Sequence, residues 1–600
     1  MERVADYVMR RLRNAGVEHI FLVTGRGILF LTDALAKEEG LTPVSTYHEQ
    51  GASYAAMAYA QAGGGLGACL VSTGCAATNA ITAVLCAWQD NVPVIFISGQ
   101  HMLHETTAYT KLPIRTYGSQ EADIVSIVKP ITKYAVMLQE ATDIAVELDK
   151  ALHYAMTGRK GPVWIDIPLD LQNARIDAEN LQRCVLEDVR PRIAAEDVAR
   201  IIDGLSGAER PILLLGGGVR SAGAEQSAAE LARKIHIPVV FTPAAADVYG
   251  AAQPLSIGSI GSIGGSRAGN FVLQHADYIL AVGTKLCSQV TGTKAAFAPS
   301  ARIDVVDIDP LEHRKDGIDY QAFLHADAND FFRMLLQTEL SPVQKEWQEQ
   351  CLHWKNVFAV PSEPFVQEYA AQNEIDLYGF AYELGAHLSD NTTVITDAGL
   401  EELIVPSAIL YRHGQRCLFP AAQGAMGYAI PAVLGAHFAG KNNIVAVVGD
   451  GSIMMNMQEL YIIAEHRIPA KIFVINNNMY AVIRKRQTDL FRKRTIGNDP
   501  SDGVPAPDFS QMAKSTGFIY EKIVHARDLS MRIDEVLRIE GSVLCEVVCT
   551  PDQKYLHQSY ALNEKRRLEH RPLEDLSPFM ERELLAREKL HFAREEDVHE

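Results

Sequence analysis

A glycine-rich turn and an asparagine pair follow two apolar segments in the last third of the sequence. Gly449-Asp450-Gly451-Ser452 ends one expected strand, and Asn476-Asn477 ends the next. Such glycines let the backbone approach phosphate oxygens, and the helix that follows offers free N–H groups. Asp450, Asn477 and the Met479 carbonyl supply oxygens of the kind that Mg²⁺ accepts beside phosphate and water. A GDG turn alone is weak, but its pairing with the asparagines predicts a diphosphate–magnesium site.

The elements that would carry these residues alternate between short apolar strands and helical segments. Continuous apolar strands separated by helices are typical of parallel sheets covered on both faces. Polar, proline-bearing stretches at 187–192 and 360–364 have the composition of linkers and divide the chain into thirds. We therefore predict an α/β protein with three doubly wound parallel-sheet domains. The expected strands are 19–23, 68–72, 93–98, 162–167, 211–218, 277–283, 302–309, 443–451 and 471–477.

The first and last thirds of the chain echo each other. Gln50-Gly51-Ala52 opens an Ala-rich helix, which is followed by a strand ending at 71–74 and by another reaching Gly99. Gln423-Gly424-Ala425 opens a similar helix, which is followed by the GDG turn and by a strand reaching Asn477. All parallel α/β domains share a rough likeness, but here the order and spacing of the signals also agree. The first and last thirds therefore resemble each other more closely than a shared fold class requires.

The composition excludes several classes of protein. The 600 residues, 48% apolar and 22% charged, can bury several cores, which excludes a mainly disordered chain. A net charge of -18 repels nucleic acid and anionic membranes, so neither is an expected partner. Two long uncharged stretches, 54–89 and 417–440, carry too many glycines, prolines and strand-like segments to span a membrane.

The ends and the cysteines bear on the compartment. The N-terminus shows a helical apolar spacing and no signal pattern, so we expect the mature protein to begin at Met1. The nine cysteines form no CxxC pair and no regular framework, which argues against a zinc ribbon or a disulfide scaffold. We therefore predict a cytoplasmic location.

Motifs spread over most of the chain point to one enzyme family. They are Tyr47-His48-Glu49-Gln50-Gly51-Ala52, Asp90-Asn91-Val92-Pro93, Ser98-Gly99-Gln100, Gln120-Glu121-Ala122-Asp123, Gly161-Pro162-Val163, Asp166-Ile167-Pro168 and Gly424-Ala425-Met426-Gly427-Tyr428. With the GDGS turn and the asparagine pair, the chain up to about residue 555 resembles the thiamine-diphosphate-dependent 2-oxo acid enzymes of the acetolactate synthase-like branch.

The resemblance implies a division into domains. Residues 1–180 would bind the pyrimidine ring of the cofactor, 190–340 would form a central Rossmann-like domain, and 362–555 would bind the diphosphate and Mg²⁺. The first and last domains would meet across a dimer interface, in a homodimer or a dimer of dimers. Residues 556–600 would be a charged extension, helical at 563–569 and 574–589, folded over the surface or over a partner subunit.

The resemblance also assigns tasks to side chains. Glu49 would hydrogen-bond the pyrimidine ring and take part in proton transfer, and we expect its carboxyl to be buried among alanines. Met426 would wedge between the two rings of the cofactor. Gln120 and Gln100 would line the substrate chamber, although each amide also suits a structural role. The implied cofactor contacts are Gly399, Gly424, Met426, Gly449, Asp450, Gly451, Ser452, Asn477 and Met479, of which Asp450, Asn477 and Met479 would hold Mg²⁺.

The central domain leaves a flavin open. Gly216-Gly217-Gly218 follows an apolar strand, and Asp307, Asp309 and Pro310 follow another. Relatives hold a flavin dinucleotide in this domain or have lost it. A GGG turn suits a nucleotide phosphate and equally suits a plain tight turn. The sequence therefore allows FAD without assigning it.

Several positions depart from the acetolactate synthase pattern near the expected substrate entrance. Arg26 stands where that enzyme has a small glycine. Gly118-Ser119 precede Gln120 in place of an aromatic residue, which enlarges the chamber and makes Ser119 a candidate contact. Gly399-Leu400-Glu401 replaces the usual Gly-Gln-His, which puts one diphosphate contact in doubt.

A further departure is a cationic run. Ile483-Arg484-Lys485-Arg486 replaces a segment that usually carries a tryptophan, and Arg492-Lys493-Arg494 follows it. A solvated helix face is the plain interpretation. In the resemblance the segment caps the active site, so Arg26, Ser119, Arg484 and Arg486 become candidate contacts of an anionic acceptor.

The expected activity is decarboxylation of a short 2-oxo acid such as pyruvate, followed by transfer of the acyl unit to a carbonyl acceptor. A nucleotide-linked keto sugar is the favoured acceptor. The alternatives are authentic acetolactate formation, simple 2-oxo acid decarboxylation, and a catalytically silent scaffold or regulatory relative. The joint presence of Glu49, Asp450 and Asn477 argues against the scaffold, because a binding role does not need all three.

Overall fold

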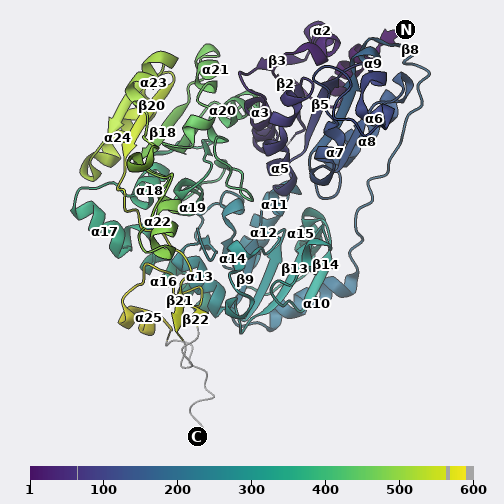
Figure 1. Cartoon of the computed structure of the whole chain (residues 1–600). Helices are drawn as coiled ribbons and strands as arrows, with labels where there is room; N and C mark the ends of the chain where they lie inside the picture. The colour runs from purple at the N-terminus through teal and green to yellow at the C-terminus, as the bar shows by residue number, and fades with distance from the viewer. Residues whose placement is uncertain (64, 563–567, 590–600) are drawn as a thin grey trace.

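The computed structural model describes residues 1–63, 65–562 and 568–589, and it contains three six-stranded sheets (Figure 1). The first sheet has the order β3-β2-β4-β5-β7-β6, with all neighbours parallel. Its strands are β2 (His19–Leu22), β3 (Thr42–Ser45), β4 (Gly67–Val71), β5 (Val94–Gln100), β6 (Tyr134–Met137) and β7 (Val163–Pro168). A short antiparallel pair, β1 (Glu2–Arg3) with β8 (Arg175–Ile176), joins the ends of this region.

Helices cover both faces of the first sheet, because alternate strand residues are apolar on each side. One face carries α1 (Val4–Asn14), α2 (Leu29–Lys37), α8 (Ile144–Met156) and α9 (Leu169–Asn173). The other carries α3 (Glu49–Gly63), α4 (Cys75–Asn79), α5 (Ile81–Gln89) and α7 (Ile124–Val128), and α6 (Thr107–Thr110) lies in the loop after β5.

The third sheet repeats the topology of the first. Its order is β16-β15-β17-β18-β20-β19, so in both sheets the six strands lie in the order second, first, third, fourth, sixth, fifth. The strands are β15 (Thr393–Ile395), β16 (Arg416–Leu418), β17 (Ile444–Gly449), β18 (Lys471–Asn476), β19 (Ile519–Ile523) and β20 (Val543–Val548). The echo between the first and last thirds of the sequence thus corresponds to a shared strand order.

The helices of the third sheet also lie on both faces. One side carries α20 (Ala429–Phe438), α21 (Glu459–Glu465) and α23 (Phe509–Thr516). The other carries α17 (Pro364–Ala371), α18 (Leu377–His387), α19 (Leu400–Ala408) and α24 (Leu529–Arg538). The cationic segment forms α22 (Ala481–Leu490).

The central sheet has a different order, β11-β10-β9-β12-β13-β14. This is the order third, second, first, fourth, fifth, sixth that is typical of dinucleotide-binding folds. Its strands are β9 (Pro211–Leu215), β10 (Val239–Phe241), β11 (Ser256–Ser259), β12 (Tyr278–Val282), β13 (Arg302–Asp307) and β14 (Ala322–His325). Its helices are α10 (Ala195–Gly207), α11 (Gly218–Ser221), α12 (Glu225–Ile235), α13 (Arg267–His275), α14 (Ser288–Thr291), α15 (Ala328–Leu336) and α16 (Lys345–Val357).

The three parallel sheets confirm the predicted fold class, and every strand expected from an apolar run lies in one of them. Residues 181–194 form neither helix nor strand and connect the first sheet to α10, as the extended trace at the right of Figure 1 shows. The domain boundaries drawn from the resemblance remain predictions. Within the described ranges, no helix has both the length and the apolar character required to cross a bilayer.

The first and third domains share one core. Helices α3 and α20 pack side by side at the top of the molecule, and their buried residues belong to a single apolar cluster (Figure 1). Gly435 in α20 makes the close approach possible, because a Cβ there would lie 2.1 Å from the Ala55 carbonyl oxygen in α3. The alanines of α3 serve the same contact, which explains the long uncharged stretches in the sequence.

The C-terminal extension corrects one prediction. Residues 568–569 are not helical, because β22 (Leu568–His570) pairs with β21 (Tyr560–Leu562); the rest of the predicted helix, 563–567, lies outside the described residues. The second predicted helix begins only at α25 (Arg582–Lys589). Pro578 interrupts it, and Arg267 donates to the carbonyls of Leu576 and Pro578 instead.

Candidate functional site

The GDG turn and the asparagine pair meet at the carboxyl edge of the third sheet. Asp450 follows β17 and Asn477 follows the neighbouring β18. The Asp450 Oδ2 accepts hydrogen bonds from Asn477 N at 3.1 Å and from Asn478 N at 2.6 Å. The Asn477 Oδ1 accepts from Met479 N at 3.2 Å, which turns the chain toward α22. The structure therefore brings the three predicted metal ligands into one short loop pair.

A second carboxylate supports this edge. Asp397, which follows β15, is fully buried and accepts from the Ser452 hydroxyl at 2.6 Å and from Ala398 N at 2.7 Å. Ser452 in turn accepts from Gly427 N at 2.9 Å. Burial raises the pKa of Asp397 to about 6, although these hydrogen bonds favour its charged form. The predicted cofactor residue Ser452 is thus engaged in holding the turn beside Met426.

Glu401 and Glu402 place two more carboxyl groups beside the glycine turns. Carboxyl oxygens of Glu401 lie 3.2 Å from the position of a Cβ on Gly399 and 3.3 Å from one on Gly449. Burial, with the nearby charges of Asp397 and Asp450, holds the pKa of Glu401 well above its usual range. Burial also raises the pKa of Glu402, which packs against Gly424, to about 8.

The donor set fits a hard divalent cation. Asp450 is 5% exposed and has only backbone N–H partners, and burial raises the pKa of its carboxyl to about 6. A carboxylate, an amide oxygen and a carbonyl leave the remaining positions of an octahedron to phosphate and water. Gly399 and Gly424, with φ of 79° and 53°, give the loops the backbone shape that such a cradle needs. Among the described residues, no group of three or more His, Cys, Asp or Glu side chains is placed to hold a metal ion.

Glu49 lies at the carboxyl edge of the first sheet, as the first residue of α3. His48 caps this helix, because its Nδ1 accepts from Gln50 N at 3.1 Å. The Glu49 Oε2 accepts from Asn79 Nδ2 at 2.9 Å. The expected burial is wrong for the single chain: Glu49 is only half-buried. The Glu49 carboxyl lies at the N-terminal end of α3, outside the tightly packed alanines of that helix.

Known protein families match all three regions. The model of the N-terminal TPP-binding domain of thiamine pyrophosphate enzymes matches residues 2–127, that of the central domain matches 198–335, and that of the C-terminal TPP-binding domain matches 397–547. An acetolactate synthase large subunit from Parasynechococcus marenigrum is 32% identical over 86% of this chain and 82% of its own length. The chain belongs to the acetolactate synthase family of thiamine pyrophosphate enzymes.

Two relatives from Escherichia coli cover still more of their own length. The large subunit of acetolactate synthase isozyme 2 is 31% identical over 90% of this chain and 95% of its own length. That of isozyme 1 is 28% identical over 92% and 94%. The two matched TPP-binding domains correspond to the regions of the first and third sheets.

The two glutamines predicted to line the substrate chamber of this family member differ in setting. Gln100 is 2% exposed, and its Nε2 donates to the Ala122 carbonyl at 2.7 Å and to Asp166 Oδ2 at 3.1 Å. Its amide is therefore used within the fold, which favours the structural alternative. Gln120 is exposed with φ of 65°, and its carbonyl lies against Gly74. Ser119 beside it is also exposed.

The other candidate contacts of the acceptor are at the surface. Arg26 is exposed in the loop after β2, at the same sheet edge as Glu49. In α22, Arg484 pairs with Asp499 at 3.1 Å, while Arg486 is exposed. None of the α22 side chains is buried. Met426 is partly buried in the loop before α20.

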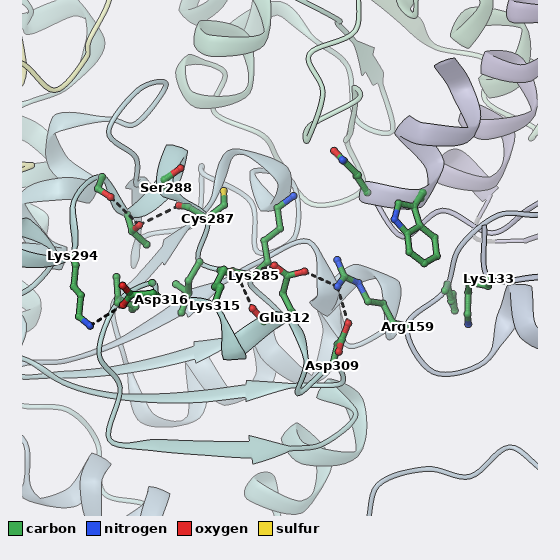
Figure 2. A pocket seen from close by; sticks show the side chains of 18 residues that line it. Lys133, Arg159, Lys285, Cys287, Ser288, Lys294, Asp309, Glu312, Lys315 and Asp316 are labelled. Carbon is green, nitrogen blue, oxygen red and sulfur yellow. Dashed lines mark hydrogen bonds and ion pairs between the residues drawn. The ribbon is translucent and has the colours of Figure 1, made fainter. Parts of the chain in front are cut away.

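A separate cavity of about 760 Å³ lies between the first and central domains (Figure 2). Arg159 reaches across it and pairs with Asp309 at 2.9 Å and with Glu312 at 2.8 Å. The lining is rich in charge, with the cations Lys133, Arg159, Lys160, Lys285, Lys294 and Lys315 and the carboxylates Asp309, Glu312 and Asp316.

The Gly216–Gly218 turn is not part of this lining. A Cβ on Gly216 would lie 2.2 Å from the Gly283 carbonyl oxygen, and one on Gly218 would lie 2.8 Å from Gly283. The glycines therefore allow two neighbouring turns of the central domain to pack backbone against backbone. This favours the plain tight turn over a phosphate cradle at the GGG sequence.

Sequence reasoning missed several residues of the site. Asp397 gave a usable signal, because it follows an apolar strand directly before the Gly399 turn. No sequence signal marked three other residues, because they lie in helices or turns and their contacts come from distant segments: Glu402, Asn456 and Glu459. Glu401 was noticed only as a departure from the family pattern.

Proposed function

We propose that this chain decarboxylates a short 2-oxo acid, with pyruvate as the expected substrate, and transfers the acyl unit to a carbonyl acceptor. The observation that carries the proposal is the meeting of Asp450 with the Asn477 loop at one sheet edge, in a chain of this family. When bound, thiamine diphosphate supplies the electron sink that stabilises the negative charge left by loss of CO₂. The protein supplies the metal site, the orientation and the proton-transfer group.

The roles of the residues follow from their positions. Asp450, Asn477 and the Met479 carbonyl would hold Mg²⁺, and the glycine turns at Gly399, Gly449 and Gly451 would let the backbone approach the diphosphate. Met426, in the loop between Gly424 and Gly427, would support the bent form of the cofactor. Glu49 would hold and pass a proton at the pyrimidine ring.

For the acceptor we propose a nucleotide-linked keto sugar. The support is the exposed cationic segment of α22 and Arg26, in a chain whose net charge is -18. Arginine forks suit the oxygens of a diphosphate. Measuring CO₂ release and product from pyruvate, with and without nucleotide-linked keto sugars, tests this choice. A coupled product and faster CO₂ release are expected; release to free aldehyde that no sugar changes would contradict it.

Acetolactate formation is the second candidate function. The relatives named above are acetolactate synthases, and they share nearly the whole length of this chain. In the same assay this candidate predicts a product from two pyruvate molecules and no response to sugars. Simple decarboxylation would give aldehyde alone, and a silent scaffold would give no turnover.

For the flavin that the sequence left open, we propose the cavity beneath Arg159 as its place. A pocket of about 760 Å³ with six cationic side chains and the Trp88 ring suits a molecule with a diphosphate and flat rings. The flavin absorbance of the purified protein, before and after adding FAD, tests this. Protein that neither carries nor takes up FAD contradicts it.

We propose a homodimer, alone or as a dimer of dimers, in the cytoplasm. Large apolar side chains are exposed beside the site: Tyr47 in front of α3, Met454 and Met455 after the GDG turn, and Tyr461 on α21. A second copy covering them would also complete the burial of Glu49. Sedimentation of the purified protein tests the assembly. The nine free cysteines support a reducing compartment.

A further inference from the structure

The segment that follows the Asp450 turn reaches back to the helix that carries Glu49. Glu459 begins α21, and its side chain is fully buried. The Glu459 Oε1 accepts a hydrogen bond from His48 N at 3.1 Å, and Tyr47 N lies 3.2 Å from both carboxyl oxygens. The two residues in front of Glu49 are thus held by a carboxyl group from the third domain.

Two neighbouring contacts also join the start of α3 to the third domain. A Cβ on Gly51 would lie 2.7 Å from Glu459 Oε1, so only glycine in the first turn of α3 lets the carboxyl approach. Asn456, 1% exposed, donates from Nδ2 to Gln50 Oε1 at 3.0 Å and to the Gly427 carbonyl at 2.8 Å. The start of α3 is therefore fastened to the loop that carries Met426 as well as to α21.

We propose that Glu459 is a positioning residue, which fixes the backbone in front of Glu49 and thereby the direction of the Glu49 side chain. The proposal rests on the role proposed above for Glu49. Burying a carboxyl is costly unless it is hydrogen-bonded, and the Glu459 carboxyl accepts from the backbone N–H groups of Tyr47 and His48 and, at 3.4 Å, from Gln458 Nε2. The helix dipole of α3 adds to the attraction, because the carboxyl lies at its N-terminus.

The pKa of Glu459 reflects both its burial and its hydrogen bonds. Burial raises the pKa of Glu459 to about 7, while the hydrogen bonds from Tyr47 and His48 favour the charged form. An apolar side chain at this place would avoid the desolvation cost, but it would leave the backbone N–H groups of Tyr47 and His48 without an acceptor.

The test compares Glu459→Ala and Glu459→Gln with the wild-type full chain, and uses Glu465→Gln, at the exposed end of α21, as the matched control. The first measurement is amide hydrogen exchange of residues 45–50 in cofactor-free protein. The second is the rate of exchange of the thiazolium C2 proton at saturating thiamine diphosphate and Mg²⁺. The third is the cofactor Kd.

For Glu459→Ala we expect the Tyr47 and His48 amides to exchange about tenfold faster and C2 exchange to slow about tenfold or more, with the Kd within about threefold. Glu459→Gln should fall between, because its oxygen still accepts from His48 N. Unchanged C2 exchange in Glu459→Ala, or a loss that only follows weaker cofactor binding, overturns the proposal. If Glu459→Ala does not fold, wild-type C2 exchange in Glu459→Gln overturns it.

Glu49→Gln, measured in parallel, separates this inference from the function it rests on. Slow C2 exchange in Glu49→Gln together with normal exchange in the Glu459 variants defeats the positioning role alone. Normal exchange in Glu49→Gln defeats the role of Glu49 itself.

Discussion

Two carboxyl groups of the site, those of Asp450 and Glu49, differ in burial and in hydrogen-bond partners. Asp450 is almost fully buried and accepts two backbone N–H groups, whereas Glu49 is half-buried and has one amide partner, Asn79. A rigid carboxylate of the first kind suits a metal, and a more accessible one suits proton transfer. In the proposed function, carboxyl groups would thus serve metal binding in one domain and proton transfer in the other.

Glu49→Gln keeps the shape of the side chain and removes its capacity to hold a proton. We expect kcat to fall by about 10²–10⁴-fold, because the loss is that of a general acid–base group. The Kd of thiamine diphosphate should stay within about tenfold, since the diphosphate and metal contacts are untouched. Steady-state kinetics and a cofactor titration check both, and full turnover would remove Glu49 from the mechanism.

Glu401→Gln should strengthen cofactor binding. The Glu401 carboxyl lies between the Gly399 and Gly449 turns, beside the place of the diphosphate, and its pKa is held above the usual range. When ionised it would repel the anion, and its raised pKa keeps more of it protonated at low pH, so the gain in thiamine diphosphate affinity of the variant should be larger at about pH 8.5 than at about pH 6. Calorimetric titrations at both pH values test this; weaker binding in the variant would show that the acid donates a needed hydrogen bond.

Helix α22 has no buried side chain, so its cationic residues lie at the surface, where a dissolved anion can reach them. We expect Arg486→Glu to raise the KM for an anionic acceptor about tenfold while the KM for pyruvate changes less than about twofold. Arg527→Glu, an exposed arginine outside this helix, is the control. Equal effects of the two variants would show that α22 does not bind the acceptor and is a solvated helix face.

Glu402 in α19 should give the stability of the cofactor-free protein a pH dependence. Burial raises the pKa of Glu402 from 4.5 to about 8. A raised carboxyl pKa stabilises the fold below the unfolded value and loses that stability as pH rises through the folded one. The contribution should disappear between about pH 4.5 and about pH 8, at roughly 1.4 kcal/mol for each pKa unit.

The variant Glu402→Gln removes this titration. Its free energy of unfolding should therefore decline less steeply than that of wild type over the same pH range, by a few kcal/mol in all. Denaturant unfolding of both cofactor-free proteins between these limits is the measurement. Parallel pH profiles would place the Glu402 carboxyl in a more solvated setting than the structure gives it.

Across the three six-stranded sheets, apolar runs predicted nine inner strands but missed the six edge strands and three buried inner strands, β10, β15 and β20. Central strands such as β5 and β17 are continuous apolar runs because both faces are covered. Edge strands such as β3 and β19 are short and largely exposed, so no apolar run marks them. The repeat predicted one shared topology for the outer sheets because duplicated order survives in spacing.

The sequence predicted part of the candidate site and missed the rest. Asp450 and Asn477 follow adjacent parallel strands, so strand order alone brings them together. Glu459 and Asn456 contact the first domain across hundreds of residues of chain, and no local pattern records such a contact. Gln100 had a structural and a functional interpretation in sequence, and only its buried partners favour the structural one.

The central claim is that this chain holds thiamine diphosphate through a metal at Asp450. Calorimetric titration of the cofactor into the purified, cofactor-free wild type and Asp450→Ala, each with and without Mg²⁺, tests it most directly. We predict saturable binding by the wild type that requires Mg²⁺ and is about a hundredfold weaker in Asp450→Ala. A folded wild type that takes up no cofactor with Mg²⁺ present, or an Asp450→Ala variant that binds equally well, would contradict the account.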